Sequence, residues 1–171
     1  SITINALPLT TPVVAPATTT VCSGSTVTVT VNPSQTGINY ELFNGGTSLS
    51  AAVAGTGGAI NLITSALTSN TTITVRATNP TTSCTTLLSG TSVVTVTAIP
   101  ATPTIGPVGP VVVCEGTAAV VLTSSAGAGN QWYKDGVLIG GATATTLNIT
   151  TILGNSGSYT VISTVSGCAS L

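Results

Sequence analysis

Side chains that could carry chemistry are few in this chain of 171 residues, which has two Lys+Arg, three Asp+Glu and no His. The carboxylates are Glu41, Glu115 and Asp135, and the cations are Arg76 and Lys134. Acid–base catalysis, catalytic triads and most metal centres use histidine or paired carboxylates. Counterion-release binding to nucleic acid needs many basic side chains. We therefore predict a protein that is not an enzyme, with no catalytic, cofactor-binding or metal residues, no cofactor and no nucleic-acid partner.

The remaining candidate sites each have a simpler interpretation. Lys134 immediately precedes an Asp135-Gly136 turn, which favours an exposed hairpin lysine over an isopeptide crosslink. Trp132 and Tyr133 are adjacent, so they point to opposite faces of a strand, and Trp132 is expected in the core rather than in a sugar-stacking platform. The three carboxylates lie on different elements across two predicted domains, which argues against a calcium site.

The composition is that of a folded chain with little charge. Hydrophobic residues make up 42% and the mean hydropathy is +0.62, which is enough apolar material for a core. Roughly a fifth of the residues are Thr, far above ordinary usage. No apolar run approaches the roughly 18–20 residues that span a membrane, so no membrane insertion is expected. No signal peptide is visible at Ser1, which predicts a mature chain or an internal segment.

Glycans are candidate partners of so Thr-rich a chain. Asn70 and Asn148 each begin an N-glycosylation sequon, and O-linked sugar on Thr and Ser is an equal alternative. A surface with so few charges is poorly protected against association. Such a surface suits a protein that works within an assembly or tethered to a cell.

The chain contains an internal repeat. Residues 21–24 and 113–116 both read Val-Cys-x-Gly, and residues 2–8 (Ile-Thr-Ile-Asn-Ala-Leu-Pro) match residues 94–100 (Val-Thr-Val-Thr-Ala-Ile-Pro). Both matches have an offset of 92 residues, a spacing that marks a repeat array of sandwich-sized units. Proline-rich stretches after each match predict stiff connectors. The predicted division is residues 1–10 as the last strand of a preceding or neighbouring domain plus a linker, 11–100 as domain 1, and 101–171 as domain 2, lacking its own last strand.

These ends suggest a hypothesis about the period. Joining Leu171 to Ser1 recreates a sequence much like the one that runs from Cys84 to Pro100. The 171 residues would then be one two-domain period, which recurs along a continuous chain or between chains that lend each other a strand.

Alternating patterns predict strands throughout. Residues 26–31 alternate Thr and Val, and residues 73–77 alternate likewise, which is typical of strands with one buried face. Asn44-Gly45-Gly46 and Asp135-Gly136 are hairpin turn signals. No stretch has the pattern of a capped amphipathic helix, so an antiparallel sandwich is expected.

In the second domain, Trp132, Leu147-Asn148-Ile149 and Gly157-Ser158-Tyr159 follow one another along the chain. In this order they resemble an immunoglobulin domain, which has a buried tryptophan on strand C, a Leu-x-Ile pattern on strand E and a tyrosine corner before strand F. The first domain has Tyr40 and Ile73 in place of the tryptophan and the tyrosine. With the Val-Cys-x-Gly start and the late cysteine, the chain resembles the immunoglobulin-like tandem repeats of large secreted and cell-surface proteins (adhesins, filaments) of Bacteroidota. This resemblance implies an all-β protein of two tandem immunoglobulin-like antiparallel β-sandwiches.

Four cysteines without metal-ligand spacing indicate disulfides in an extracellular setting. One pairing is within domains, Cys22–Cys84 and Cys114–Cys168. The other is head-to-tail, Cys22–Cys168, with Cys114 bonded to Cys84 of the following period. In an immunoglobulin sandwich the turns that carry these cysteines lie at opposite ends, roughly 23 Å apart along strand B, whereas a disulfide needs Cα atoms within about 7 Å. This argument favours the head-to-tail pairing, and the presence of one pair in each domain favours the other.

The function predicted from these patterns is mechanical. We expect a structural repeat segment of an extracellular filament, stalk or giant surface adhesin, as one period of a longer repeat, with neighbouring repeats or subunits of the same protein as partners. The alternatives are a carbohydrate-binding module of a secreted protein and a pilin-like subunit that polymerises by strand donation. All three are extracellular or cell-surface roles.

Overall fold

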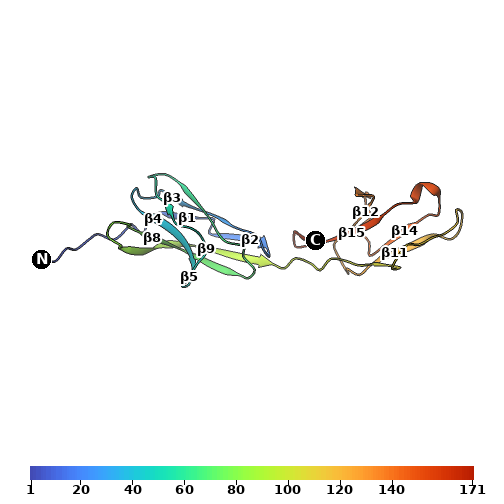
Figure 1. Cartoon of the computed structure of the whole chain (residues 1–171), viewed down its shortest axis with the longest axis horizontal. Coiled ribbons are helices and arrows are strands. Elements are labelled where there is room, and N and C mark those ends of the chain that lie inside the picture. The colour runs from blue at the N-terminus through green and yellow to red at the C-terminus, as the bar shows by residue number, and fades with distance from the viewer. The chain divides into compact units, whose positions relative to one another are not determined.

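The computed structural model describes residues 1–171 and divides them into two compact units, Ser1–Thr97 and Ala98–Leu171. Figure 1 shows that both units consist of β-strands and connecting loops. The one helix is a single 3-10 turn at Leu153–Asn155. No helix is therefore long and apolar enough to cross a membrane.

Unit 1 contains two sheets. The smaller has the order β1-β3-β7, formed by Val13–Ala15, Thr28–Asn32 and Ile60–Ile63. The larger has the order β2-β9-β8-β4-β5, with β6 also on β4, and is formed by Thr18–Cys22, Thr85–Thr97, Thr71–Thr78, Asn39–Asn44, Thr47–Ser48 and Val53–Ala54. All pairs are antiparallel except β2 with β9, which is parallel.

The core of unit 1 follows the alternation in its sequence. Val29 and Val31 of β3 are fully buried, and so are Ile73 and Val75 of β8, whereas the intervening threonines lie toward the surface. Because successive side chains of a strand point to opposite faces, each strand has one apolar face. The predicted strands and their buried valines are confirmed.

Unit 2 has the same two-sheet plan with fewer paired residues. One sheet has the order β10-β11-β14, formed by Ile105–Gly106, Val120–Ser124 and Thr146–Ile149. The other has the order β13-β12-β15-β16, formed by Val137–Leu138, Asn130–Lys134, Tyr159–Val165 and Cys168–Ala169. Two antiparallel sheets in this order make an immunoglobulin-like sandwich, so the predicted fold class is confirmed.

The diagnostic residues of unit 2 occupy the positions that the resemblance implies. Trp132 is fully buried, and its Nε1 donates a hydrogen bond of 2.9 Å to the carbonyl of Ala144. The Tyr159 hydroxyl donates to the carbonyl of Asn155 at 2.7 Å, which closes the tyrosine corner. Burial of Trp132 removes it as a sugar-stacking surface.

The two units differ at their last strand. In unit 1, β9 is 13 residues long and pairs with both β8 and β2. In unit 2 the corresponding strand, β16, has 2 residues, and residues 110–114, which lie 92 positions after β2, form no strand. The buried apolar cluster of unit 2 consequently contains only Leu122, Trp132 and Val161, whereas that of unit 1 includes all of its central strands.

Candidate functional site

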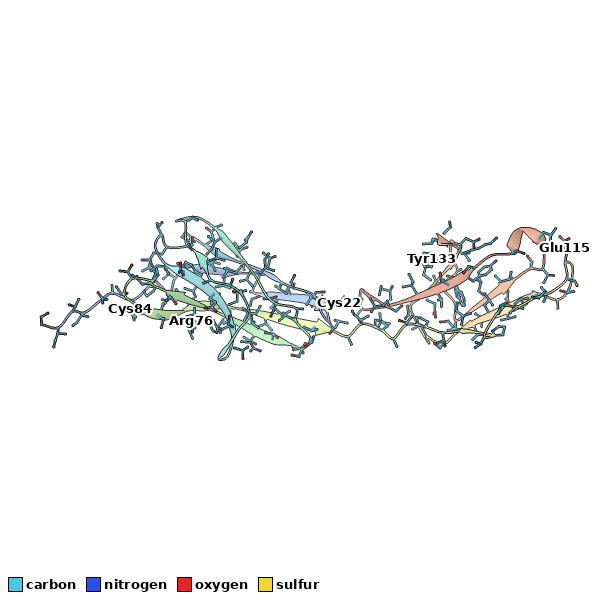
Figure 2. The ribbon with its side chains drawn as sticks, viewed as in Figure 1. Cys22, Arg76, Cys84, Glu115 and Tyr133 are labelled. Atoms are coloured by element: carbon cyan, nitrogen blue, oxygen red, sulfur yellow. The ribbon has the colours of Figure 1, made fainter.

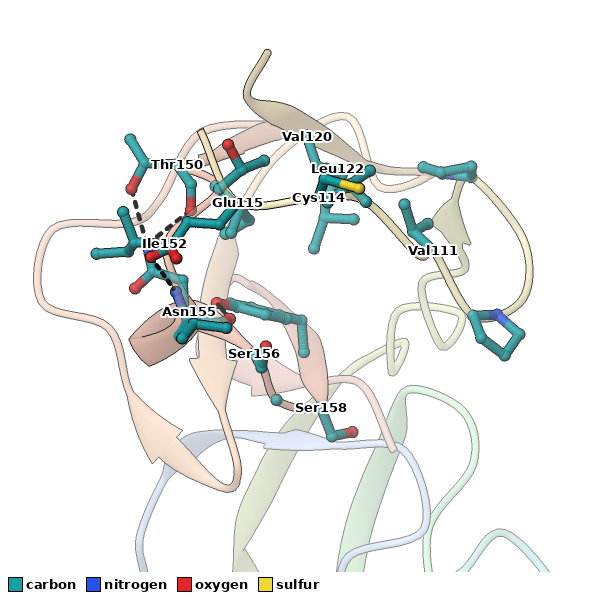
Figure 3. Close-up of a pocket in the computed structure, with 18 of the residues that line it drawn as sticks. Val111, Cys114, Glu115, Val120, Leu122, Thr150, Ile152, Asn155, Ser156 and Ser158 are labelled. Carbon is teal, nitrogen blue, oxygen red and sulfur yellow. Dashed lines mark hydrogen bonds between the residues drawn. The ribbon is translucent and has the colours of Figure 1, made fainter. Parts of the chain in front are cut away.

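A pocket of about 520 Å³ opens in unit 2 where the last strand is short. Its apolar lining comes from Ile105, Val111, Val113, Val120, Leu122, Ile149 and Tyr159. Figure 3 shows Val111, Val120 and Leu122 on one side, with Asn155, Ser156 and Ser158 across from them. The pocket therefore lies between residues 110–114 and the start of β15, and we call it the strand groove.

Unit 1 shows what fills the equivalent space. There β9 lies between β2 and β8, with Val94 fully buried and Val21 and Val96 packed against the core. In unit 2, Val111 is 44% exposed and Val113 is 50% exposed, because no strand covers them. By the 92-residue offset, Val111 and Val113 correspond to Thr19 and Val21 of β2, which pair with β9 in unit 1.

Residues 1–7 form the second part of the site. They carry no strand or bridge, and the side chains of Ile2, Ile4 and Leu7 are 92%, 91% and 64% exposed. The segment is anchored to unit 1 just after these residues, where Pro8 is buried and the backbone N–H of Leu9 donates to Gln35 Oε1 at 3.1 Å. By the 92-residue offset, Ile2 and Ile4 correspond to Val94 and Val96 of β9.

The charged residues of unit 1 form one local cluster. Arg76 Nη2 lies 3.0 Å from Glu41 Oε2, and the two residues face each other across β8 and β4. The Arg76 guanidinium also lies 3.9 Å from the centre of the Phe43 ring. A half-exposed ion pair of this kind contributes about 1 kcal/mol or less, so its role is structural.

The charged residues of unit 2 lie around the tyrosine corner. Asp135 Oδ1 accepts a hydrogen bond of 2.8 Å from the backbone N–H of Ser158, and Lys134 Nζ donates to the carbonyl of Gly154. A Cβ at Gly157 would lie 2.6 Å from Asp135 Oδ2 and 2.7 Å from Lys134 Cε, so both side chains would have to shift to make room for one. Lys134 precedes the turn as predicted, but it is half-buried against this loop rather than fully exposed.

One side chain at the tyrosine corner has a shifted pKa. Burial raises the pKa of Tyr159, and the nearby Asp135 carboxylate raises it further. The hydroxyl therefore stays protonated and keeps its hydrogen bond to Asn155 across the neutral range. Tyr159 also lines the strand groove, so an uncharged, hydrogen-bonded tyrosine forms part of one wall of the groove.

Glu115 lies at the rim of the same groove, where its Oε1 is 3.4 Å from the backbone N–H of Leu153. No group of three His, Cys, Asp or Glu side chains lies together in the chain. Glu41 belongs to unit 1, while Glu115 and Asp135 belong to unit 2.

The cysteines fall into two classes. Cys22 and Cys168 are disulfide-bonded, whereas Cys84 and Cys114 are free thiols. Figure 2 shows Cys22 and Cys84 at opposite ends of unit 1, which agrees with the positions of Cys22 beside Thr97 and of Cys84 just before β9. A 13-residue strand is roughly 40 Å long, far beyond disulfide reach. The intradomain pairs Cys22–Cys84 and Cys114–Cys168 are therefore wrong, and the observed state supports a Cys22–Cys168 disulfide.

The strand groove was not predicted from the sequence. The repeat had indicated that domain 2 lacks its last strand, but no lining residue was named. The signal was present in the same 92-residue spacing, because it places Val111 and Val113 where β2 contacts β9 in unit 1.

No protein-family model and no curated protein matches the chain. Among solved structures, it is similar to the titin domains Z1Z2 in complex with telethonin, with 20% identity over 95% of this chain and 94% of that one and a TM-score of 0.39. It is also similar to the I-band fragment I67–I69 of titin (14% identity, 98% and 64% covered, TM-score 0.47) and to the four N-terminal Ig domains of Dscam1 isoform 9.44 (18% identity, 94% and 44% covered, TM-score 0.34). The fold assignment above stands on the sheet topology of each unit.

Proposed function

We propose that this chain is a structural repeat module of an extracellular filament, stalk or surface adhesin, with two immunoglobulin-like units in each period. One observation carries the proposal: two units with the same two-sheet plan follow each other along the chain, and matching sequence segments in them are offset by 92 residues, as in a repeat array.

The cysteines support the extracellular setting. Cys22 and Cys168 are disulfide-bonded, and disulfides persist where the surroundings are oxidising. At the 92-residue spacing, Cys114 corresponds to Cys22. Cys84 lies just before β9, and Cys168 lies at the start of β16. In an array, Cys114 of one period would therefore pair with Cys84 of the next.

The strand arrangement of unit 1 suits a load-bearing role. The parallel ladder of β2 and β9 pairs Thr18 with Val93 through Cys22 with Thr97. Tension that pulls β2 toward its N-terminus and β9 toward its C-terminus loads these hydrogen bonds together, in shear. A chain loaded in this way resists extension until the whole ladder breaks.

Force spectroscopy on the chain held at its two ends, with the Cys22–Cys168 disulfide reduced, tests this role, because the intact bond would carry the load from Cys22 directly to Cys168. We expect a discrete unfolding peak for unit 1 that is weakened by Thr19→Pro, because the backbone of Thr19 faces β9 in the parallel ladder and proline has no N–H, and that is unchanged by the control Thr47→Ala at an exposed position of β5. Extension without a discrete peak would contradict the load-bearing role.

Surface labelling tests the location. An antibody against the purified chain should label intact cells of the native source without permeabilisation, and the signal should disappear after external protease treatment. Labelling only after permeabilisation would contradict an extracellular assembly.

A further inference from the structure

We propose that Asn148 of unit 2 carries an N-linked glycan, which covers the outer face and the open edge of the sheet formed by β10, β11 and β14. Attachment of this glycan requires export of the chain, so it rests on the extracellular location in the proposed function. It adds a defined modification site to that function.

The side chain of Asn148 lies outside the core of unit 2. In β14, Leu147 and Ile149 pack against the buried cluster, and Asn148 between them is exposed. Because successive side chains of a strand point to opposite faces, the Asn148 amide is directed toward solvent. Thr150 completes the sequon at an exposed position directly after the strand. A sugar on Asn148 Nδ2 therefore displaces no packed side chain of unit 2.

Unit 1 has an asparagine in the same place that is hydrogen-bonded and has no sequon. Asn61 of β7 also lies outward on the edge strand of a three-stranded sheet, opposite Thr30 of β3. The Thr30 hydroxyl donates a hydrogen bond of 2.8 Å to Asn61 Oδ1, and Ile63 occupies the position where a sequon needs Ser or Thr. In unit 2 the residue opposite Asn148 is Val121, which has no hydroxyl, and the Asn148 side chain makes no hydrogen bond within the chain. The amide of Asn148 is thus free, whereas that of Asn61 is engaged.

The other sequon, at Asn70, has a role in the fold. Asn70 Oδ1 accepts a hydrogen bond of 2.8 Å from the backbone N–H of Val96, which ties the residue before β8 to β9. The fold therefore explains an asparagine at position 70 without a sugar. No contact within unit 2 requires an asparagine at position 148, and this difference separates the two sequons.

The edge strand β14 lacks the usual protection against pairing with other chains. It is the last strand in the order β10-β11-β14, so the backbone on its far side has no sheet partner. No charged residue occurs in these three strands, and Val121 beside Asn148 is 47% exposed. Open edges are templates for association, and natural proteins cover or charge them. A bulky, hydrophilic glycan at Asn148 supplies this cover.

The modification is the transfer of an oligosaccharide from a lipid pyrophosphate donor by a glycosyltransferase of the exporting cell. Asn148 Nδ2 forms a bond to C1 of the first sugar, and the bond from C1 to the pyrophosphate oxygen breaks. The amide loses one proton, and the lipid pyrophosphate leaves. The reaction requires no oxidant or reductant.

Mass spectrometry of the protein from its native source tests the site. After reduction and digestion with trypsin, Asn148 lies in the peptide that begins at Asp135, and Asn70 lies in the peptide that ends at Arg76. We expect the first peptide to be heavier than its sequence by a whole number of sugar residues, with fragment ions that place the added mass on Asn148. If this peptide has only its unmodified mass, the proposal is overturned.

Variants made in a secretory host that attaches N-linked glycans test the sequon. Asn148→Gln keeps a neutral amide and Thr150→Ala keeps the asparagine, yet both should abolish the added mass. Thr150→Ser keeps the hydroxyl and should retain it. Circular dichroism should show the same fold for all of these chains, because Asn148 makes no hydrogen bond that holds the fold. Added mass that persists in Asn148→Gln, such as O-linked sugar on Thr, would overturn the assignment to Asn148.

Light scattering tests the covering role in a Cys84→Ser/Cys114→Ser background, in which no disulfide forms between copies. The Asn148→Gln chain should self-associate at a lower concentration than the glycosylated parent, because its β14 edge and Val121 are uncovered. Adding Val121→Thr, which removes the exposed valine, should move this concentration upward. The matched control Val108→Thr, at a site that is 95% exposed and outside the strands of unit 2, should not.

Equal self-association of the glycosylated parent and the Asn148→Gln chain would overturn the covering role. Unmodified Asn148 in native material that still gives surface labelling and the force peak would overturn the glycan and leave the repeat-module function standing.

Discussion

Val94 is fully buried in β9, whereas Ile2, its counterpart 92 residues earlier in the chain, is 92% exposed. The same position of the repeat thus has a core role in one place and no packing partner in the other. This difference gives a stability prediction. Val94→Ala should lower the free energy of unfolding of unit 1 by about 2 kcal/mol, because it removes buried methyl groups and leaves a cavity.

Urea unfolding measures the effect. In the monomeric chain, Ile2→Ala serves as the matched control and should leave the unfolding midpoint unchanged, since its side chain has no packing to lose. Equal destabilisation by the two substitutions would show that residues 1–7 pack within their own chain.

The chain has two tryptic sites, after Arg76 and Lys134, and these make the disulfide pairing easy to read. A Cys22–Cys168 bond should join peptide 1–76 to peptide 135–171 in a non-reducing digest and leave peptide 77–134 separate. The intradomain pairs would instead join all three peptides. In assembled material that has been oxidised, Cys114–Cys84 pairing between copies should link peptide 77–134 to a second peptide 77–134.

That crosslink needs an oxidant, such as oxidised glutathione, which accepts the two electrons and two protons of the two thiols and is itself reduced to two thiols. Cys114→Ser should abolish it and leave the 1–76 to 135–171 linkage intact. Persistence of linked 77–134 peptides in the Cys114→Ser variant would contradict the assignment.

Unit 2 should unfold before unit 1, because its buried apolar cluster has three residues and its last strand is short. Trp132 is the single tryptophan and is fully buried in unit 2, so its fluorescence reports that unit alone. We expect the fluorescence transition at a lower urea concentration than the main circular dichroism transition. Coincident transitions would contradict this order.

Alkaline pH should destabilise unit 2 through Tyr159, whose pKa in the folded state is raised above 10.0. Below pH 10.0 the Tyr159 hydroxyl is protonated in both the folded and the unfolded chain, so the free energy of unfolding is not reduced by its ionisation. As pH rises past this value, the unfolded chain ionises first, so the free energy of unfolding falls until the folded pKa is reached. Urea unfolding followed by Trp132 fluorescence measures this slope in the Cys84→Ser/Cys114→Ser background. Tyr159→Phe should make the slope shallower, and an unchanged slope would remove Tyr159 as the cause.

Much of the fold could be predicted because its signals are local. Alternation of Val with Thr defines the buried faces of β3 and β8, and the Asp135-Gly136 turn lies between Lys134 and Val137 as predicted. The buried Trp132 was likewise predicted from its neighbours in the sequence. Such features depend on a few adjacent residues, so they do not require knowledge of strand pairing.

The features that were missed depend on non-local pairing. Residues 110–114 have strand-forming valines but form no strand, because a strand needs a partner and the equivalent of β9 is short in unit 2. The Arg76–Glu41 pair arises from the register of β8 against β4, and the half-buried state of Lys134 arises from its bond to Gly154. No spacing in the sequence specifies these contacts.

The pairing of β2 with β9 has a consequence for the order of folding. Thr18 at the start of β2 pairs with Val93 near the other end of unit 1, so this ladder joins the two ends of the unit. Contacts between residues so far apart in sequence carry a large loop-closure entropy and form late. During synthesis, unit 1 can therefore complete its larger sheet only after the chain has emerged through Thr97.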